Sequence, residues 1–512
     1  MNNEESRILL QAELDSGKTI AQRRELGQFS TPSALAGEIV SFGLGLLPEG
    51  RVRFLDPALG TGAFYSALLR QAEEAQIEHA TGIEIDAHYA GPATELWADT
   101  PIHITIGDFT ELPPEDRYNL IVCNPPYVRH HLIGGKERIR IRTKQFSGID
   151  LSGLAGLYCH FMLQSVKWMA PGGIAGWLIP SEFMDVNYGR EVKKFLLENV
   201  ELLRIHRYNP NNVQFHDALV SSAVIWFRNR NPAAERAVTF SYGGQLASPD
   251  ISREIPVSEL RSETKWSRFP LKGARAQGAH MAVLGDYFTV KRGIATGGNN
   301  FFILEKNRLE ELGLPREVFR PVLPNARRLN TEEILADALG NPILESELFL
   351  LDCALPESEI QVKFPKLWAY LLTGKDTVAN GYLCKSKKCW YSQERREAPL
   401  FLCTYMGRER RRSNQAFRFI LNHSDATVTN CYLAIYPNSA MKRFLQGHPE
   451  SLYAVWNIMN QIDPQRFIDE GRVYGGGLRK VEPSELMRIP VPEIEKLIME
   501  AEGAADRLEK TP

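Results

Sequence analysis

The turn that decides the fold reads Asp56-Pro57-Ala58-Leu59-Gly60-Thr61-Gly62-Ala63-Phe64. It follows a short apolar run, Arg51–Asp56, which is typical of a buried strand. The two glycines let the backbone come close to a ligand at the carboxyl end of that strand. A dinucleotide fingerprint would carry a third glycine where Tyr65 stands. The turn therefore indicates a ligand at this strand end and disfavours a nicotinamide cofactor; a nucleoside cofactor is indicated only together with the acids that end the next strands.

Strands and helices alternate outward from this turn. Apolar runs predict strands at Arg51–Asp56, His79–Asp86, His103–Phe109, Tyr118–Asn124, Ile174–Pro180, Val200–Tyr208 and Ser221–Asn229. This pattern predicts a Rossmann-like α/β fold with a seven-stranded, mostly parallel sheet covered on both faces. Ahead of it, Thr31 is expected to cap a helix that Pro32 begins.

The alternation stops near residue 245. We therefore predict a first domain over residues 1–245 and a second, mixed α+β domain over residues 246–512. Pro171-Gly172-Gly173 predicts a turn that ends one of the helices of the first domain.

Acidic residues end the second and third predicted strands. Glu84 follows Gly62 by 22 residues, a spacing that suits acceptance of ribose hydroxyls. Asp108 can accept the amine of an adenine ring, and Phe109 can pack on the face of that ring. Each of these acids could instead cap the following helix, and this alternative stays open.

The fourth predicted strand ends in Asn124-Pro125-Pro126-Tyr127. An adenine amine is a poor nucleophile because its lone pair is delocalised into the ring. The Asn124 side-chain oxygen and the Pro125 carbonyl can accept its two hydrogens and localise that lone pair. Pro126 stiffens the turn, and Tyr127 offers a flat face for stacking a base.

A base in a duplex reaches such a turn only if it is flipped out, at a cost of a few kcal/mol. Tyr127 can supply one stacking wall, and Phe215, in a polar loop, can supply the other. Phe215 could equally be a core residue.

Charge is distributed unevenly along a chain whose net charge is −2. Residues 129–144 hold six Lys or Arg and one acid, and residues 385–418 hold ten and three. The second stretch is interleaved with Trp390, Tyr391, Phe401, Tyr405 and Phe417, which favours DNA contact over a solvated charged face. The predicted DNA-binding residues are Arg129, Lys144, Arg292, Arg408, Arg410, Arg411 and Arg412.

In the order of these motifs, the sequence resembles the gamma class of N6-adenine DNA methyltransferases, the TaqI-like enzymes of type II restriction–modification systems. Gln28-Phe29-Ser30-Thr31-Pro32 comes first, and Gly293–Gly297 and Tyr474–Leu478 are weaker matches. The resemblance implies transfer of a methyl group from S-adenosyl-L-methionine to adenine N6 in double-stranded DNA. Asn124, Pro125, Tyr127 and Phe215 would hold the target base. The implied cofactor contacts are Thr31, Pro32, Asp56, Pro57, Ala58, Gly60, Gly62, Glu84, Ile85, Asp108, Phe109 and Asn124.

Several expectations accompany this interpretation. We expect a monomer in the cytoplasm, with no membrane span and no metal site, paired in function with a separate restriction endonuclease. The alternatives are methylation of RNA adenine or of a protein glutamine, and a DNA-binding module with a decayed cofactor fold. The sequence does not separate adenine N6 from cytosine N4, and it does not reveal the recognition sequence.

Overall fold

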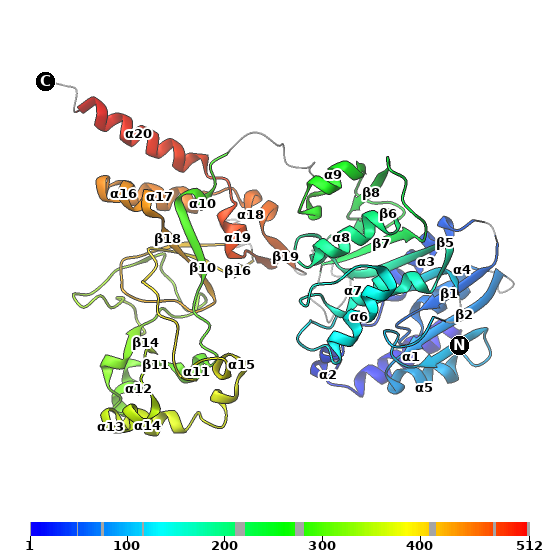
Figure 1. Ribbon diagram of the computed structural model, residues 1–512, viewed down its shortest axis with the longest axis horizontal. Helices are drawn as coiled ribbons and strands as arrows, with labels where there is room; N and C mark the ends of the chain where they lie inside the picture. Colours follow the sequence, from blue (N-terminus) through cyan, green and yellow to red (C-terminus); the bar gives the residue numbers. More distant parts are fainter. Residues whose placement is uncertain are drawn as a thin grey trace. The chain divides into compact units, whose positions relative to one another are not determined.

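The computed structural model describes residues 2–48, 50–72, 76–114, 117–209, 221–271, 281–408, 416–474 and 478–508. The chain forms two compact units (Figure 1). Unit 1 comprises Met1–Gln277 with Tyr474–Gly476, and unit 2 comprises Gly278–Val473 with Gly477–Pro512.

Unit 1 is built on a nine-stranded sheet with the order β3-β2-β1-β4-β5-β7-β6-β8-β9. The strands are β1 Val52–Asp56, β2 Ile77–Glu84, β3 Ile102–Ile106, β4 Tyr118–Cys123, β5 Met169–Pro180, β6 Glu201–Arg207, β7 Ser222–Arg228, β8 Ala237–Tyr242 and β9 Ile251–Pro256. Strands β3, β2, β1, β4 and β5 run parallel to one another, whereas β7 is antiparallel to both β5 and β6. The α/β class and the seven predicted strands are found, and β8 and β9 extend the sheet beyond them.

The position of β8 and β9 moves the boundary between the two parts of the chain. The predicted boundary after residue 245 falls between these two strands, which pair with each other antiparallel. Strand β8 also pairs with β6. Because this pairing ties both strands to the sheet, unit 1 extends to Gln277.

Both faces of the sheet are buried, which explains the continuous apolar runs of its strands. Neighbouring residues such as Phe54 and Leu55, or Leu120 and Ile121, belong to opposite cores, because successive side chains in a strand alternate between the two faces. One core is completed by helices α3 Ser33–Leu46, α4 Ala63–Gln71 and α5 Ala87–Leu96. The other is completed by α7 Leu157–Gln164, α8 Gly189–Glu198 and α9 Val257–Ser262, and α6 Lys136–Ser147 packs against α7. Helices α1 Asn3–Ser16 and α2 Ile20–Glu25 precede them.

Two local predictions were wrong. Helix α3 has exposed Pro32 at its N-cap position and no side-chain cap, because the Thr31 hydroxyl bonds elsewhere. Pro171-Gly172-Gly173 lies inside β5 instead of forming a turn before it. Gly172 has a φ of 74°, and the pairing register of β4 with β5 shifts beside it. The extra residues are therefore absorbed as an irregularity of the ladder.

Unit 2 contains three small sheets and short helices. The five-stranded sheet has the order β10 Phe288–Arg292, β18 Tyr432–Pro437, β15 Phe401–Thr404, β17 Phe419–Asn422 and β13 Glu333–Ile334. A three-stranded sheet has the order β11 Ile303–Glu305, β14 Leu348–Leu351 and β12 Phe319–Pro321. A second three-stranded sheet has the order β16 Met406–Gly407, β20 Leu478–Lys480 and β19 Arg472–Tyr474. The helices are α10 Leu284–Tyr287, α11 Asn299–Phe302, α12 Lys306–Glu311, α13 Glu357–Lys363, α14 Pro365–Leu372, α15 Tyr382–Lys385, α16 Ser439–Gly447, α17 Ser451–Asn460, α18 Pro464–Glu470, α19 Pro483–Met487 and α20 Pro492–Leu508. Within the described residues, every helix is too short or too polar to span a bilayer.

Candidate active site

The turns after β1, β2, β3 and β4 meet at one edge of the sheet, because the carboxyl ends of parallel strands lie together. A cavity of about 340 Å³, called here the edge cavity, opens between them. This volume lies within the range of small-ligand sites. Eight residues predicted from the sequence line it: Pro57, Ala58, Gly60, Glu84, Ile85, Asp108, Phe109 and Asn124.

The glycine turn combines ligand access with close packing. Gly60 has a φ of 56°, lines the edge cavity and has open space where a Cβ would stand. Gly62 has a φ of 89°, and a Cβ there would lie 2.7 Å from the Trp97 Nε1 atom. Asp56 and Gly62 lie outside the cavity lining. The Asp56 side chain is buried and accepts the Ala58 N–H at 3.1 Å, so this residue stabilises the conformation of the turn without lining the cavity.

Glu84 joins the end of β2 to the glycine turn. Its Oε2 accepts the Gly60 N–H and its Oε1 accepts the Asp86 N–H, both at 2.9 Å. Burial raises the pKa of Glu84. Burial also raises the pKa of Asp56 to about 8, and the neighbouring Glu84 charge adds to this rise. Two carboxyl groups are therefore held in a poorly solvated site beside the cavity wall.

The third turn supplies one polar and one aromatic wall. Asp108 Oδ1 accepts the Thr110 N–H at 2.8 Å and the Thr110 hydroxyl at 2.7 Å. Phe109 is buried, with its ring 5.1 Å from that of Phe161. Ile85 behaves differently, because 62% of its surface is exposed although it lines the cavity.

Asn124 stands at the tip of β4 with its amide nitrogen fully used. Nδ2 donates to the Phe29 carbonyl at 2.9 Å and to the Thr31 hydroxyl at 3.1 Å. Its Oδ1 is buried and has no hydrogen-bond partner among the described residues. An orphaned buried acceptor costs about 1–3 kcal/mol, so this atom is prepared for a donor that the described part of the chain does not supply.

The other residues of the Asn124–Tyr127 motif have less contact with the edge cavity. Pro125 and Tyr127 lie outside the cavity lining, whereas Pro126 is part of it. The Tyr127 hydroxyl donates to the Leu178 carbonyl at 3.1 Å, and its ring lies 5.8 Å from that of Phe29. Phe215, the predicted second stacking aromatic, lies outside the described residues.

The N-terminal segment forms a wall that the sequence interpretation largely missed. Gln11 and Asp15 of α1 and residues 25–30 line the edge cavity, whereas Thr31 and Pro32 do not. The Gln28-Phe29 part of the family motif was a usable signal for this wall. Nothing in the sequence of α1 indicated its place. Other lining residues that were missed follow the Asn124 turn: Val128, Leu132, Ile133, Gly134, Ile139, Leu157 and Phe161.

Polar contacts tie this wall to the sheet edge. The Thr61 hydroxyl donates to Gln11 Oε1 at 2.7 Å, and the Tyr89 hydroxyl donates to Asp15 Oδ1 at 2.9 Å. Lys18 forms an ion pair with Asp86. Helix α1 is therefore fixed against the glycine turn and α5.

The residues predicted to contact DNA are partly visible. Arg129, Lys144, Arg292 and Arg408 are exposed, and Lys144 forms an ion pair with Asp150 at 3.2 Å. The Arg292 guanidinium lies 4.2 Å from the ring centre of Tyr405. Arg410, Arg411 and Arg412 lie outside the described residues.

The aromatic part of that prediction was wrong. Tyr391, Phe401, Tyr405 and Phe417 are all at most 5% exposed and belong to the cores of unit 2. Only Phe401 lies in a strand, β15, whose four residues are all buried, and the other three rings pack into the cores from turns and loops. These rings are therefore not free to read bases.

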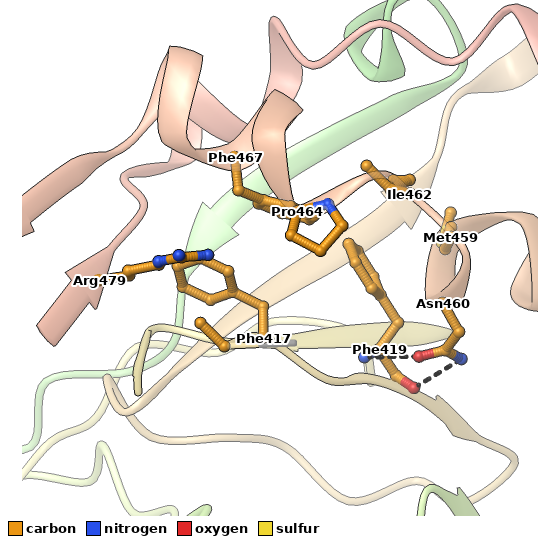
Figure 2. Close-up of a pocket in the computed structure, with 9 residues that line it drawn as sticks. Phe417, Phe419, Met459, Asn460, Ile462, Pro464, Phe467 and Arg479 are labelled. Carbon is orange, nitrogen blue, oxygen red and sulfur yellow. Dashed lines mark hydrogen bonds between the residues drawn. The ribbon is translucent and has the colours of Figure 1, made fainter. Parts of the chain in front are cut away.

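A second cavity lies inside unit 2, beside Phe417, Phe419 and Phe467 (Figure 2). Its volume is about 10 Å³, roughly the space of one water molecule. Asn460 bonds the backbone N–H and carbonyl of Phe419 at 3.2 Å each. This cavity is a packing gap in the core and too small for a nucleoside or an amino acid.

Family models match both units. Residues 70–214 match the model described as Eco57I restriction-modification methylase, and residues 271–511 match that of the Type II methyltransferase M.Eco57I, C-terminal domain. The chain belongs to the Type II restriction–modification methyltransferases. It is therefore an enzyme of this family, and S-adenosylmethionine is its cofactor.

Full-length relatives agree with this assignment. The Type II methyltransferase M.XamI of Xanthomonas campestris pv. amaranthicola is 27% identical over 492 residues, which cover 92% of this chain and 86% of the relative. M.AccI of Acinetobacter calcoaceticus is 26% identical over 493 residues, which cover 93% and 87%. The Type IIL restriction-modification enzyme MmeI, solved in complex with DNA, has the same fold with a TM-score of 0.55. It is 12% identical, and the match covers 96% of this chain and 78% of MmeI.

Proposed function

We propose that this methyltransferase transfers a methyl group to the N6 amine of an adenine flipped out of double-stranded DNA, and that this protects the DNA from a cognate restriction endonuclease. The observation that carries the proposal is the buried Asn124 Oδ1, which receives no hydrogen bond from any residue that the structure describes. Both hydrogens of the same amide are taken by Phe29 and Thr31, so only the acceptor end remains for a substrate.

The acceptor pair explains why an amine is the substrate. The Pro125 carbonyl, the other predicted acceptor, receives no hydrogen bond from the described part of the chain. Two preorganised acceptors hydrogen-bond to both hydrogens of an exocyclic amine and localise the nitrogen lone pair. Because the acceptors are already in place, this costs no reorganisation at the moment of reaction. S-adenosylmethionine supplies the methyl group on a positively charged sulfur.

The edge cavity fits this cofactor in volume and chemistry. Its walls combine a carboxylate at Glu84, a second carboxylate at Asp108 and apolar surfaces at Ile85 and Phe109. Carboxylates accept ribose hydroxyls and an adenine amine, and the apolar side chains cover the purine faces. We assign Glu84 to the ribose, and Asp108, Phe109 and Ile85 to the adenine.

A flipped base needs stacking partners to offset the cost of extrusion. Tyr127 and Phe29 form an aromatic corner beside Asn124, and stacking on an aromatic ring contributes roughly 1–3 kcal/mol per base. Phe215 remains our candidate for the opposite wall.

Unit 2 is the proposed reader of DNA sequence. It holds about half of the chain and exposes Arg292 and Arg408, while Arg129 and Lys144 are exposed on unit 1. An enzyme that methylates a protein glutamine or RNA has no DNA sequence to recognise, so a second unit of this size favours DNA as the substrate. We propose that the enzyme acts as a monomer.

Incubation with radiolabelled cofactor and duplex DNA, RNA or a protein mixture tests the substrate class. We expect label in duplex DNA, recovered as N6-methyladenine after digestion to nucleosides. Recovery of N4-methylcytosine, or label only in RNA or protein, would contradict the proposal. Sequencing of the protected DNA then identifies the target site.

Asn124→Ala tests the acceptor role directly. Loss of one preorganised hydrogen-bonding group of this kind costs about 10²–10³-fold in rate. We expect a loss of that order with cofactor affinity changed by no more than about threefold, because Oδ1 serves the base while Nδ2 is held by the Phe29 carbonyl and the Thr31 hydroxyl. Full turnover by this variant would exclude the role.

A further inference from the structure

We propose that Thr31 and the Phe29 carbonyl are positioning groups that fix which end of the Asn124 amide faces the substrate. This inference rests on the proposed function. It adds a role for two residues of the N-terminal segment, Phe29 of the cavity wall and Thr31 behind it, that neither touch the reacting atoms nor contribute a charge.

Hydrogen-bond chemistry determines the orientation of the amide. An asparagine amide has two N–H donors and one acceptor oxygen. The Phe29 carbonyl lies 2.9 Å from Nδ2, and a carbonyl can only accept, so the amide nitrogen must face it. The Thr31 hydroxyl, 3.1 Å from Nδ2, uses the second hydrogen. A rotated amide would place two acceptor oxygens against each other and present an N–H to the substrate amine.

The segment that carries these groups is itself fixed. The Tyr127 N–H donates to the Gly27 carbonyl at 3.2 Å, and Gln28 donates to Asp86 at 2.8 Å. Gly27 has a φ of 64°, and a Cβ there would lie 2.4 Å from the Tyr127 nitrogen. Only glycine therefore allows this approach, and the segment runs directly against the Asn124–Tyr127 turn.

Thr31 is buried, and its hydroxyl accepts the hydrogen bond from Asn124 Nδ2. The residue is 7% exposed and does not cap α3. Helix α3 begins at Ser33, two residues later, so the helix holds Thr31 in place without using its hydroxyl. Thr31 therefore stands behind Asn124 and fixes the side-chain conformation of that residue through a hydrogen bond.

The test compares Thr31→Val, which removes the acceptor and keeps the shape, with Thr31→Ser, which keeps the hydroxyl. Exposed Thr94 of α5, whose hydroxyl bonds only its own helix, provides Thr94→Val as the matched control. Rates of a single round of methyl transfer, cofactor affinity and thermal unfolding are measured for each. We expect Thr31→Val to slow transfer about tenfold or more, which corresponds to the loss of one buried hydrogen bond. Thr31→Ser and Thr94→Val should stay within about threefold of the wild-type rate.

A base analogue reports the orientation of the amide itself. Hypoxanthine carries a carbonyl oxygen where adenine carries its amine, so a correctly oriented Asn124 repels it. We expect the wild type and Thr31→Ser to bind a duplex with hypoxanthine at the target position at least several-fold more weakly than one with adenine. Thr31→Val should narrow this ratio, which a general loss of packing would not do.

The outcomes separate the two proposals. If Asn124→Ala loses transfer but Thr31→Val keeps the wild-type rate and the wild-type discrimination, the positioning role is wrong and the acceptor role stands. If Asn124→Ala transfers normally, the proposed function itself fails. A slow Thr31→Val enzyme with relaxed discrimination and unchanged cofactor affinity supports both.

Discussion

The indole nitrogen of Trp97 donates a 3.0 Å hydrogen bond to the carbonyl of Thr61, in the middle of the glycine turn. Trp97 is 1% exposed, so the turn is fixed from inside the protein by a large buried ring. The same ring occupies the space next to Gly62. The glycine at this position is thus required by packing as well as by its backbone conformation.

This contact predicts that Gly62→Ala destabilises unit 1. A positive φ costs a non-glycine residue about 1–2 kcal/mol, and the 2.7 Å approach to Trp97 adds a steric penalty. Chemical denaturation should show a loss of at least about 1–2 kcal/mol, together with weaker cofactor binding. Gly45→Ala, in helix α3 with open space around it, is the control: it should leave cofactor binding unchanged and keep or slightly raise the stability, because alanine favours a helix over glycine. A Gly62→Ala protein as stable as the wild type would show that the turn can rearrange.

Asp56 predicts a pH dependence of stability. Its pKa in the folded protein is about 8 because of burial, whereas an unfolded chain titrates it near its ordinary value of about 4. Between these values the folded state keeps a proton that the unfolded state has released. Stability therefore falls as pH rises through this window, by up to about 1.4 kcal/mol per pH unit.

Asp56→Asn removes this titration and keeps an acceptor oxygen for the Ala58 N–H. The new amide adds a constant penalty, so the informative quantity is the change with pH. The free energy of unfolding of the variant minus that of the wild type should increase from about pH 5 to about pH 8. A difference that stays flat or decreases over this range would mean that Asp56 is ionised in the folded protein.

Ile85 predicts an effect on binding without an effect on folding. Its side chain lines the edge cavity but is 62% exposed, so a bound cofactor can bury it. Loss of this burial in Ile85→Ala is worth about 1–2 kcal/mol, which is roughly a 5- to 30-fold rise in the cofactor Kd. Calorimetric titration should find this rise with an unchanged unfolding temperature. Ile106→Ala, at an equally exposed position outside the cavity lining, should change neither, and equal effects of the two variants would exclude a contact at Ile85.

Arg292 predicts a salt-dependent contribution to DNA affinity. Its guanidinium is held over Tyr405 and is therefore ordered before DNA binds. If it contacts a phosphate, Arg292→Ala should reduce the slope of log affinity against log salt by about 0.9. Arg308→Ala removes the same charge from α12, where Arg308 pairs with Glu311, and should leave the slope unchanged. Identical slopes for all three proteins would remove Arg292 from the DNA surface.

The sequence alone determined the sheet of unit 1 and the positions of its functional turns. Buried parallel strands require continuous apolar runs, and ligand-binding residues of such a sheet collect at the strand ends. Gly60, Glu84, Asp108 and Asn124 were therefore recognisable from local patterns, and the structure brings all four to one cavity.

The tertiary structure decided what those residues contact. Thr31 follows the local pattern of a helix cap, yet its hydroxyl holds Asn124, 93 residues away. Tyr405 and Phe417 match a nucleic-acid pattern, yet they lie in a core. Strand β8 joins the sheet beside β6, with β7 between the two in the sequence, and β9 then pairs with β8. Local patterns record backbone preference and alternation, whereas a side chain's partner depends on which distant segments pack against it, and that information appears only when the chain has folded.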